Sequence, residues 1–195
     1  MAKKRAGPGK CRCSRPRPGL APVVIRNDGP DTSITITATG IPAEPEPSGG
    51  KGRAIRRSVF TLSGQEVALD SPAQGTRLVV VLEITPPTYA EGRLMVVDPL
   101  SAGFEIDNPH LTWSGSTAEL DWLDVLQSTQ HVQFRQDRFM AAVDWSSDQP
   151  FRLAFIVRAV SPGTFHHPAA LFQDMYRPTY RARGEAGTLV ITPSG

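Results

Sequence analysis

The residues of this sequence that could do chemistry are two cysteines, four histidines and a scatter of aspartates. One residue separates Cys11 from Cys13, whereas a thioredoxin-type redox pair needs two between them and a structural zinc site needs four ligands. His166 and His167 are adjacent, so on a strand they would point to opposite faces and would not hold one ion together. We expect a solvent-facing histidine pair near a turn, no metal site and no cofactor.

Nothing in the sequence selects a catalytic centre. No serine elbow G-x-S-x-G, dinucleotide-binding fingerprint or phosphate-binding loop is present in the 195 residues. No acid–base pair stands out among the aspartates, which are spread over expected turns and strand edges: Asp121, Asp124, Asp137 and Asp144. The sequence therefore predicts a protein that is not an enzyme.

The segment 165–184, expected to be a long aromatic loop, has the most unusual composition. Its large apolar, basic and stiffening residues are Phe165, Phe172, Met175, Tyr176, Tyr180, Arg177, Arg181, Arg183, Pro168 and Pro178. A rigid loop that carries aromatic and methionine side chains suits a docking surface, and it would equally suit a cap over its own core. Asp174 and Arg177 flank Met175 and Tyr176, and two charges are costly to bury together. We therefore expect the tip of this loop to lie at the surface.

The elements that must position these residues are mainly short strands. Gly and Pro recur between apolar runs, which is typical of an all-β protein, and seven to nine expected strands fit an antiparallel β-sandwich. The near-continuous apolar run 77–84 predicts a strand buried on both faces, and 151–160 alternates between two faces. Residues 23–26 and 32–39 are expected to form a hairpin, and 119–127 is the one expected helix.

The first 22 residues differ from the rest in charge. They carry seven basic residues and no acid, whereas the remainder has 14 basic and 19 acidic residues. With no aromatic residue to bury, this segment is expected to be a disordered basic tail. Such a tail attracts polyanions without sequence specificity, or it serves only as a solubilising extension. One interpretation of the whole chain is thus an independent β-sandwich interaction or adhesion module with a polyanion-binding tail.

Several long motifs point to another interpretation. They are DMYRP at 174–178, VVDPLSAGFEIDNP at 96–109, QFRQDRF at 133–139 and FIVRAVSPGTF at 155–165. Together they resemble the C-terminal macroglobulin domain of the bacterial alpha-2-macroglobulin family, and the resemblance covers roughly residues 23–192. It implies three parts: the disordered tail 1–22, CUB-like remnant strands and a linker at 23–48, and a macroglobulin-type β-sandwich at 49–195.

The resemblance implies a role in protease inhibition. Members of the family are periplasmic protease traps in which a Cys–Gln thioester captures the protease after a bait region is cleaved. The C-terminal domain shields this thioester, and the shielding pair would map to Met175 and Tyr176, flanked by Asp174, Arg177 and Pro178. The implied partners are the thioester and CUB-like domains, and target proteases only through the intact inhibitor.

The chain also departs from the family. The thioester motif, the bait region and the preceding macroglobulin domains are absent from the sequence, which suggests a C-terminal fragment with no thioester of its own. The basic start is not followed by the apolar stretch of a signal peptide, so the sequence as written predicts no export. Expressed in this form, the chain would be cytoplasmic although its family is periplasmic.

Overall fold

The computed structural model describes residues 11–12, 24–25, 28–30, 32–35, 44–50, 52–69, 72–86, 91–109, 116–117, 120–125 and 129–195. The chain divides into two compact units, Met1–Ala43 and Glu44–Gly195. In the first unit, β1 (Cys11–Arg12) pairs antiparallel with β2 (Val24–Ile25). The rest of the expected tail 1–22 lies outside the described residues.

The predicted hairpin between 23–26 and 32–39 is wrong where the structure describes it. β2 pairs with β1 instead, and residues 32–35 form no strand, while 36–39 lie outside the described residues. Ile34 is 49% exposed. Ile34 therefore finds no apolar layer to pack on, and a two-stranded hairpin has little stability without such a layer.

The second unit contains a four-stranded antiparallel sheet in the order β3-β4-β9-β6. Its strands are β3 (Ala54–Thr61), β4 (Arg77–Thr85), β9 (Phe151–Ala159) and β6 (Phe104–Asp107). The apolar run in β4 is buried on both faces as predicted, since Leu78 to Leu82 are all buried. β4 lies between two partner strands, so this continuous burial follows from its central place in the sheet.

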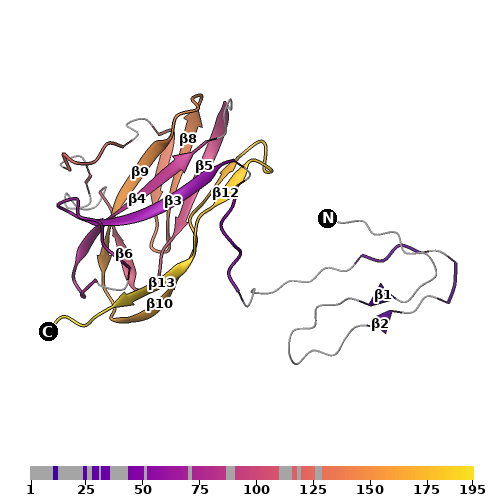
Figure 1. The fold of residues 1–195 in the computed structure, drawn as a ribbon, viewed down its shortest axis with the longest axis horizontal. Helices are drawn as coiled ribbons and strands as arrows, with labels where there is room; N and C mark the ends of the chain where they lie inside the picture. Colours follow the sequence, from indigo (N-terminus) through magenta and orange to yellow (C-terminus); the bar gives the residue numbers. More distant parts are fainter. Residues whose placement is uncertain are drawn as a thin grey trace. The chain divides into compact units, whose positions relative to one another are not determined.

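A five-stranded sheet, in the order β12-β11-β5-β8-β7, faces the first (Figure 1). Its strands are β12 (Arg181–Arg183), β11 (Leu171–Asp174), β5 (Gly92–Pro99), β8 (Arg138–Trp145) and β7 (His131–Phe134). All neighbouring pairs in this sheet are antiparallel. Residues 94–97 of β5 are thereby held between β8 and β11, which places the C-terminal part of the chain beside its middle.

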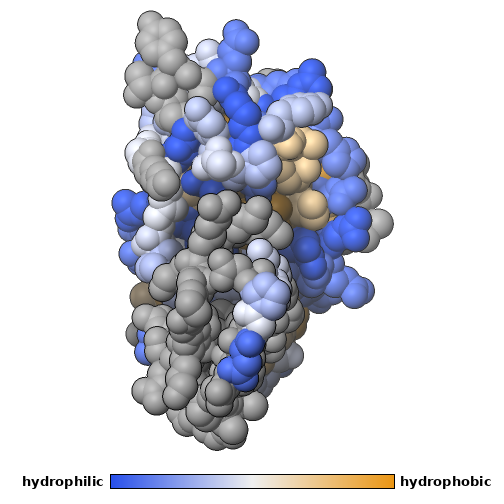
Figure 2. Space-filling model, turned by 90° about the vertical axis from the view of Figure 1, so that its right-hand side faces the viewer, coloured by the Kyte–Doolittle hydropathy of each residue, from blue (hydrophilic) through white to orange (hydrophobic). Residues whose placement is uncertain are grey.

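The core lies between the two sheets. Alternate residues of β9 point into it, among them Phe151, Leu153 and Phe155, as the period-2 pattern predicts. Phe139 from the opposite sheet stacks on Phe155, with ring centroids 4.5 Å apart and ring planes at 12°. Among the coloured residues in Figure 2, hydrophilic ones predominate and a smaller apolar area is visible, consistent with apolar side chains gathered inside. The predicted all-β antiparallel sandwich is confirmed.

The segment 165–184 is not a long loop. It contributes most of β10 (Gly163–His167), which pairs with β13 (Gly187–Ile191), and then β11 and β12. Figure 1 shows β10 and β13 side by side at the end of the sandwich that carries the C-terminus. These strands have only three to five residues, and their partners are set by sheet pairing, so a local pattern could not reveal them.

The helix predicted at 119–127 is absent from the described part of that segment, 120–125, which forms a turn and extended chain. Leu120 and Leu123 pack instead on a small cluster on the outer face of the four-stranded sheet, formed by Val79, Val81 and Ile156. The three-residue spacing of these leucines therefore comes from a non-helical segment that crosses the outer face of the sheet. Within the described residues, no helix is long and apolar enough to cross a membrane.

Candidate functional site

The turn between β11 and β12 presents the two side chains that the sequence singled out. Met175 is 52% exposed and Tyr176 is 71% exposed, the two most exposed large apolar side chains among the described residues. The chain then turns back through Arg177–Tyr180, closed by a 2.8 Å hydrogen bond from the Tyr180 N–H to the Arg177 carbonyl. Pro178 occupies the second position of this turn, where its fixed φ is favourable. We call residues 174–180 the tip.

The carboxylate of Asp174 fixes the conformation of the tip through hydrogen bonds. Its Oδ1 accepts hydrogen bonds from the N–H groups of Tyr176 and Arg177, both at 2.9 Å, and its Oδ2 accepts two from the Arg177 guanidinium. Burial acts to raise the pKa of Asp174, but these donors together hold it below its ordinary value. Asp174 therefore stays ionised and fixes the backbone on which Met175 and Tyr176 stand.

The burial of Asp174 departs from the reasoning that predicted the tip. We expected charge on both flanks of Met175 and Tyr176 to keep that part of the chain in water, yet Asp174 is only 2% exposed. Its four hydrogen bonds compensate for the lost hydration. The hydrogen bonds of the buried Asp174 carboxylate hold the turn in a shape that leaves Met175 and Tyr176 exposed. Of the two charged residues, only Arg177 stays in water, with its side chain 44% exposed.

Arg177 connects two parts of the structure to the start of the tip: Glu91, just before β5, and Tyr180, at the end of the tip. Its guanidinium donates to the carbonyl of Glu91 and lies 4.9 Å from the ring centroid of Tyr180. On that ring Arg53 also stacks, at 4.1 Å. Gly92 allows the close approach, since a Cβ there would lie 3.0 Å from Oδ2 of Asp174. The tip is thus braced by two other parts of the chain, at Arg53 and at Glu91–Gly92.

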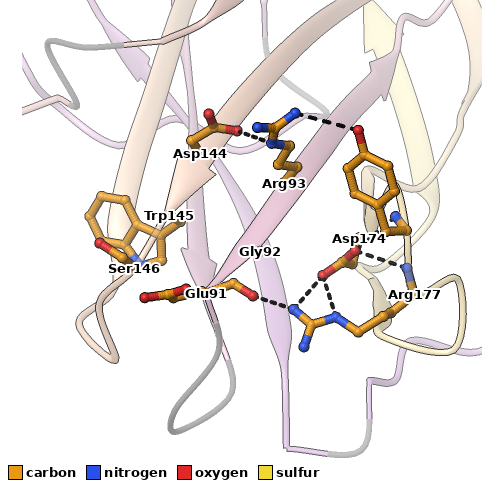
Figure 3. Close-up of a pocket in the computed structure, with 9 residues that line it drawn as sticks. Glu91, Gly92, Arg93, Asp144, Trp145, Ser146, Asp174 and Arg177 are labelled. Atoms are coloured by element: carbon orange, nitrogen blue, oxygen red, sulfur yellow. Dashed lines mark hydrogen bonds and ion pairs between the residues drawn. The ribbon is translucent and has the colours of Figure 1, made fainter.

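A pocket of about 360 Å³ opens beside the tip. Figure 3 shows Arg93 and Asp144 at one side of it, Trp145 and Ser146 at another, and Asp174 and Arg177 facing them. Its charged groups are largely engaged with one another, as in the Arg93–Asp144 and Arg177–Asp174 pairs. In the described part of the chain, no group of three or more potential metal ligands comes together. The pocket is thus lined mainly by charged groups that are already paired with one another.

A second polar cluster is buried inside the sandwich. Arg57 and Asp98 form an ion pair at 2.6 Å, with side chains 8% and 3% exposed. Burial raises the pKa of Asp98 to about 6, and the charge of Arg57 offsets this only in part. No local pattern predicts this pair, because each partner lies in a strand whose neighbours in space are distant in the chain.

His167 belongs to the same buried region, so the predicted solvent-facing histidine pair is wrong for this residue. It is 3% exposed, its Nδ1 lies 2.8 Å from Oγ of Ser101, and Phe104 packs edge-on against its ring. Burial, with the charges of Arg57 and His166 adding to it, lowers the pKa of His167 to about 3. His166 points the other way and is exposed, as alternation along β10 requires.

The structure separates the aromatic residues that the sequence grouped together. Met175, Tyr176 and Tyr180 lie on the tip, whereas Phe172 is 1% exposed in the core and Phe165 packs on the core. Phe172 and Phe165 thus contribute to the core, whereas Met175 and Tyr176 stay exposed beyond the end of β11, and docking of the tip stays a prediction. Sequence reasoning missed Arg93 and Gly92, which are brought to the tip by the pairing of β5 with β11. It also missed Arg53, which lies just before β3 of the other sheet and contacts the Tyr180 ring.

Comparison with known proteins agrees with this architecture. The family model "Bacterial Alpha-2-macroglobulin MG10 domain" matches residues 52–179. Alpha-2-macroglobulin of Escherichia coli strain K12 is 32% identical over 166 residues, which cover 81% of this chain and 10% of that protein. Alpha-2-macroglobulin of Xylella fastidiosa strain 9a5c is 30% identical over 170 residues, with the same two coverages. The chain thus spans about a tenth of the length of these curated relatives.

Solved structures give the same result. The crystal structure of native E. coli alpha-2-macroglobulin from domain MG7 to the C-terminus has a TM-score of 0.71 at 32% identity, covering 79% of this chain and 25% of that chain. Salmonella alpha-2-macroglobulin reacted with methylamine has a TM-score of 0.68 at 33% identity, covering 79% and 10%. The predicted CUB-like remnant at 23–48 lies outside the matched residues 52–179 and stays a prediction. Sequence, fold and family model together show that the chain belongs to the bacterial alpha-2-macroglobulin family and carries its MG10 domain.

Proposed function

We propose that this domain guards the thioester of an alpha-2-macroglobulin-type protease inhibitor, with the tip docked on a separate thioester domain. The observation that carries the proposal is the contrast at the tip. Met175 and Tyr176 are more than half exposed, yet the turn beneath them is fixed by the buried carboxylate of Asp174. Exposing an apolar side chain to water raises the free energy of the protein, and covering that side chain with a partner lowers it.

The physical properties of the two residues suit a shield. A tyrosine ring covers a large area with few rotatable bonds, and methionine adapts to an uneven partner surface. The bracing of the turn by Asp174 and Arg177 limits the entropy that docking would cost. A tip of this kind excludes water from a reactive bond beneath it. Premature hydrolysis of the thioester would thereby be slowed until the inhibitor rearranges.

The reactive bond must come from another domain. Both cysteines of the chain precede residue 14, and the Cys-x-Glu-Gln motif is absent from its sequence. The partners in this proposal are accordingly the other domains of the same inhibitor, in a protein that acts in the periplasm. Target proteases would meet this domain only within the intact inhibitor.

The double change Met175→Ala and Tyr176→Ala is expected to cost the isolated chain about 1 kcal/mol or less, as surface substitutions generally do. The tip's backbone contacts do not involve these side chains, so the fold should survive. Urea unfolding followed by circular dichroism measures the loss. Leu62→Ala, at another apolar side chain that is 37% exposed, is the matched control. A loss of several kcal/mol from the double change alone would show that the two side chains are core.

Made at the aligned positions of intact E. coli alpha-2-macroglobulin, the same double change is expected to speed spontaneous thioester hydrolysis by about tenfold or more, since each 1.36 kcal/mol taken from a barrier is a factor of ten. The release of free thiol with time, without protease, gives the rate. The change aligned with Leu62→Ala should leave that rate unaltered. Equal hydrolysis rates in the parent and the double variant would refute the proposed function.

A further inference from the structure

We infer that Arg93, on the neighbouring strand β5, is a positioning residue that sets the direction of the Tyr176 side chain. The inference rests on the proposed function for its consequence, but the positioning itself is a property of this chain alone. Arg93 lies 83 residues before Tyr176 and contacts both exposed residues of the tip. No motif in the sequence links the two positions.

The first contact is made by the backbone. The carbonyl of Arg93 accepts a 2.8 Å hydrogen bond from the N–H of Met175. β5 and β11 are paired up to Asp174 and Leu94, so this bond lies one step beyond the last pair of the ladder. The first residue of the exposed tip is therefore still tied to the sheet, and the side chain of Arg93 is placed next to Tyr176.

The second contact is made by the guanidinium. Its NH1 donates to the Tyr176 hydroxyl at 3.4 Å, and its Cζ lies 5.7 Å from the ring centroid. Figure 3 shows the guanidinium of Arg93 at the top of the pocket, next to the carboxylate of Asp144. One cation thus meets the polar end of the tyrosine and lies within reach of its ring, which restricts the directions that the ring can take.

A third group holds the cation itself. Nε of Arg93 lies 3.5 Å from Oδ1 of Asp144, which is paired with Arg93 across β5 and β8. The two side chains are 61% and 47% exposed. An exposed ion pair contributes little to overall stability, so the effect of Asp144 is to orient Arg93. Asp144 thus orients Arg93, and Arg93 in turn orients Tyr176.

This chain of contacts matters because Tyr176 has little else to fix it. At 71% exposure a tyrosine would ordinarily move among several rotamers. A cation–π contact at an exposed site shifts such a distribution by roughly two- to fivefold. The preferred orientation of the Tyr176 side chain is then already populated before docking, so the thioester domain does not have to select it from several rotamers.

The positioning can be measured in the full chain labelled with 3-fluorotyrosine, whose three tyrosines are Tyr89, Tyr176 and Tyr180. Their ¹⁹F resonances are assigned with Tyr→Phe variants. Arg93→Gln should move the Tyr176 resonance most of the way to its position in urea, while Tyr180 stays in place. Arg93→Lys should restore much of the native shift, because it keeps a cation and a donor. Asp144→Asn leaves Arg93 in place but removes its ion-pair partner, so the Tyr176 resonance should move part of the same way.

The matched control is Arg152→Gln on the four-stranded sheet, where Arg152 forms a comparable exposed pair with Glu83. It should leave all three resonances unmoved. If Arg93→Gln left the Tyr176 resonance at its native position, the inference would be overturned. Movement of the Tyr180 resonance as well would indicate a disturbed fold, and the Asp144→Asn variant then decides: an unmoved Tyr176 resonance in it also overturns the inference.

A second measurement separates this inference from the proposed function. In E. coli alpha-2-macroglobulin that carries this domain in place of its own MG10 domain, Arg93→Gln should raise spontaneous thiol release by roughly two- to fivefold, the size of the lost orientation. Tyr176→Ala in the same chimera should raise it further. If the tyrosine change had no effect while the ¹⁹F shift responded to Arg93→Gln, the proposed shielding would fail and the positioning would stand.

Discussion

Replacing Asp98 by alanine should lower the free energy of unfolding by about 3–5 kcal/mol, the usual cost of removing one partner of a buried ion pair. The change leaves the guanidinium of Arg57 inside the sandwich without its 2.6 Å partner, and the Arg57 side chain is only 8% exposed. Urea unfolding at pH 7.5 measures the loss. That pH lies above the value of about 6 to which burial raises the pKa of Asp98, so the carboxylate is ionised in the parent protein.

The matched control is Glu83→Ala, which breaks the pair between Glu83 and Arg152 at 2.8 Å. Those side chains are 39% and 51% exposed, so the expected loss is about 1 kcal/mol or less. Replacing Arg57 and Asp98 together by apolar residues of similar volume should recover most of the loss. Similar losses for Asp98→Ala and Glu83→Ala would mean that Arg57 reaches water in solution.

Replacing Phe172 by alanine should also lower the free energy of unfolding by about 3–5 kcal/mol, because it empties a large volume in a packed core. Phe172 is 1% exposed and belongs to the cluster that joins the two sheets. It lies three residues before Met175, whose truncation is expected to cost about 1 kcal/mol or less. Thermal and urea unfolding of Phe172→Ala and Met175→Ala, measured side by side, test the contrast. If the two variants lost equal stability, the division between core and tip would be wrong.

Long apolar patterns allowed much of the sandwich to be predicted. The Val-rich strand β4 and the alternating strand β9 each supply enough residues to show their burial locally. Leu120 and Leu123 were misjudged as helical because a strap that crosses a sheet can place two leucines at the same spacing. β10, β11 and β12 were missed because three to five residues carry too little pattern.

The candidate site was predictable in its exposed part alone. The sequence placed Met175 and Tyr176 at the surface, and both are exposed. It could not show that Asp174 would be buried, since this depends on four hydrogen bonds formed once the turn closes. It could not reveal Arg93 either, because that contact is set by the register of β5 against β11. The motif at 174–178 therefore predicts which side chains are exposed, and the register of β5 against β11 determines how they are oriented.

The pairing of β5 with β11 also has a consequence for biosynthesis. The tip hangs from a strand pair whose members are separated by more than 70 residues, so a long chain segment must close before the tip exists. Contacts of such separation form slowly compared with local ones. During synthesis, Tyr176 can therefore meet Arg93 only after β11, near the end of the chain, has been made and has paired with β5. In an inhibitor of the proposed kind, a newly made thioester would depend on the folding of this late-synthesised surface for its protection.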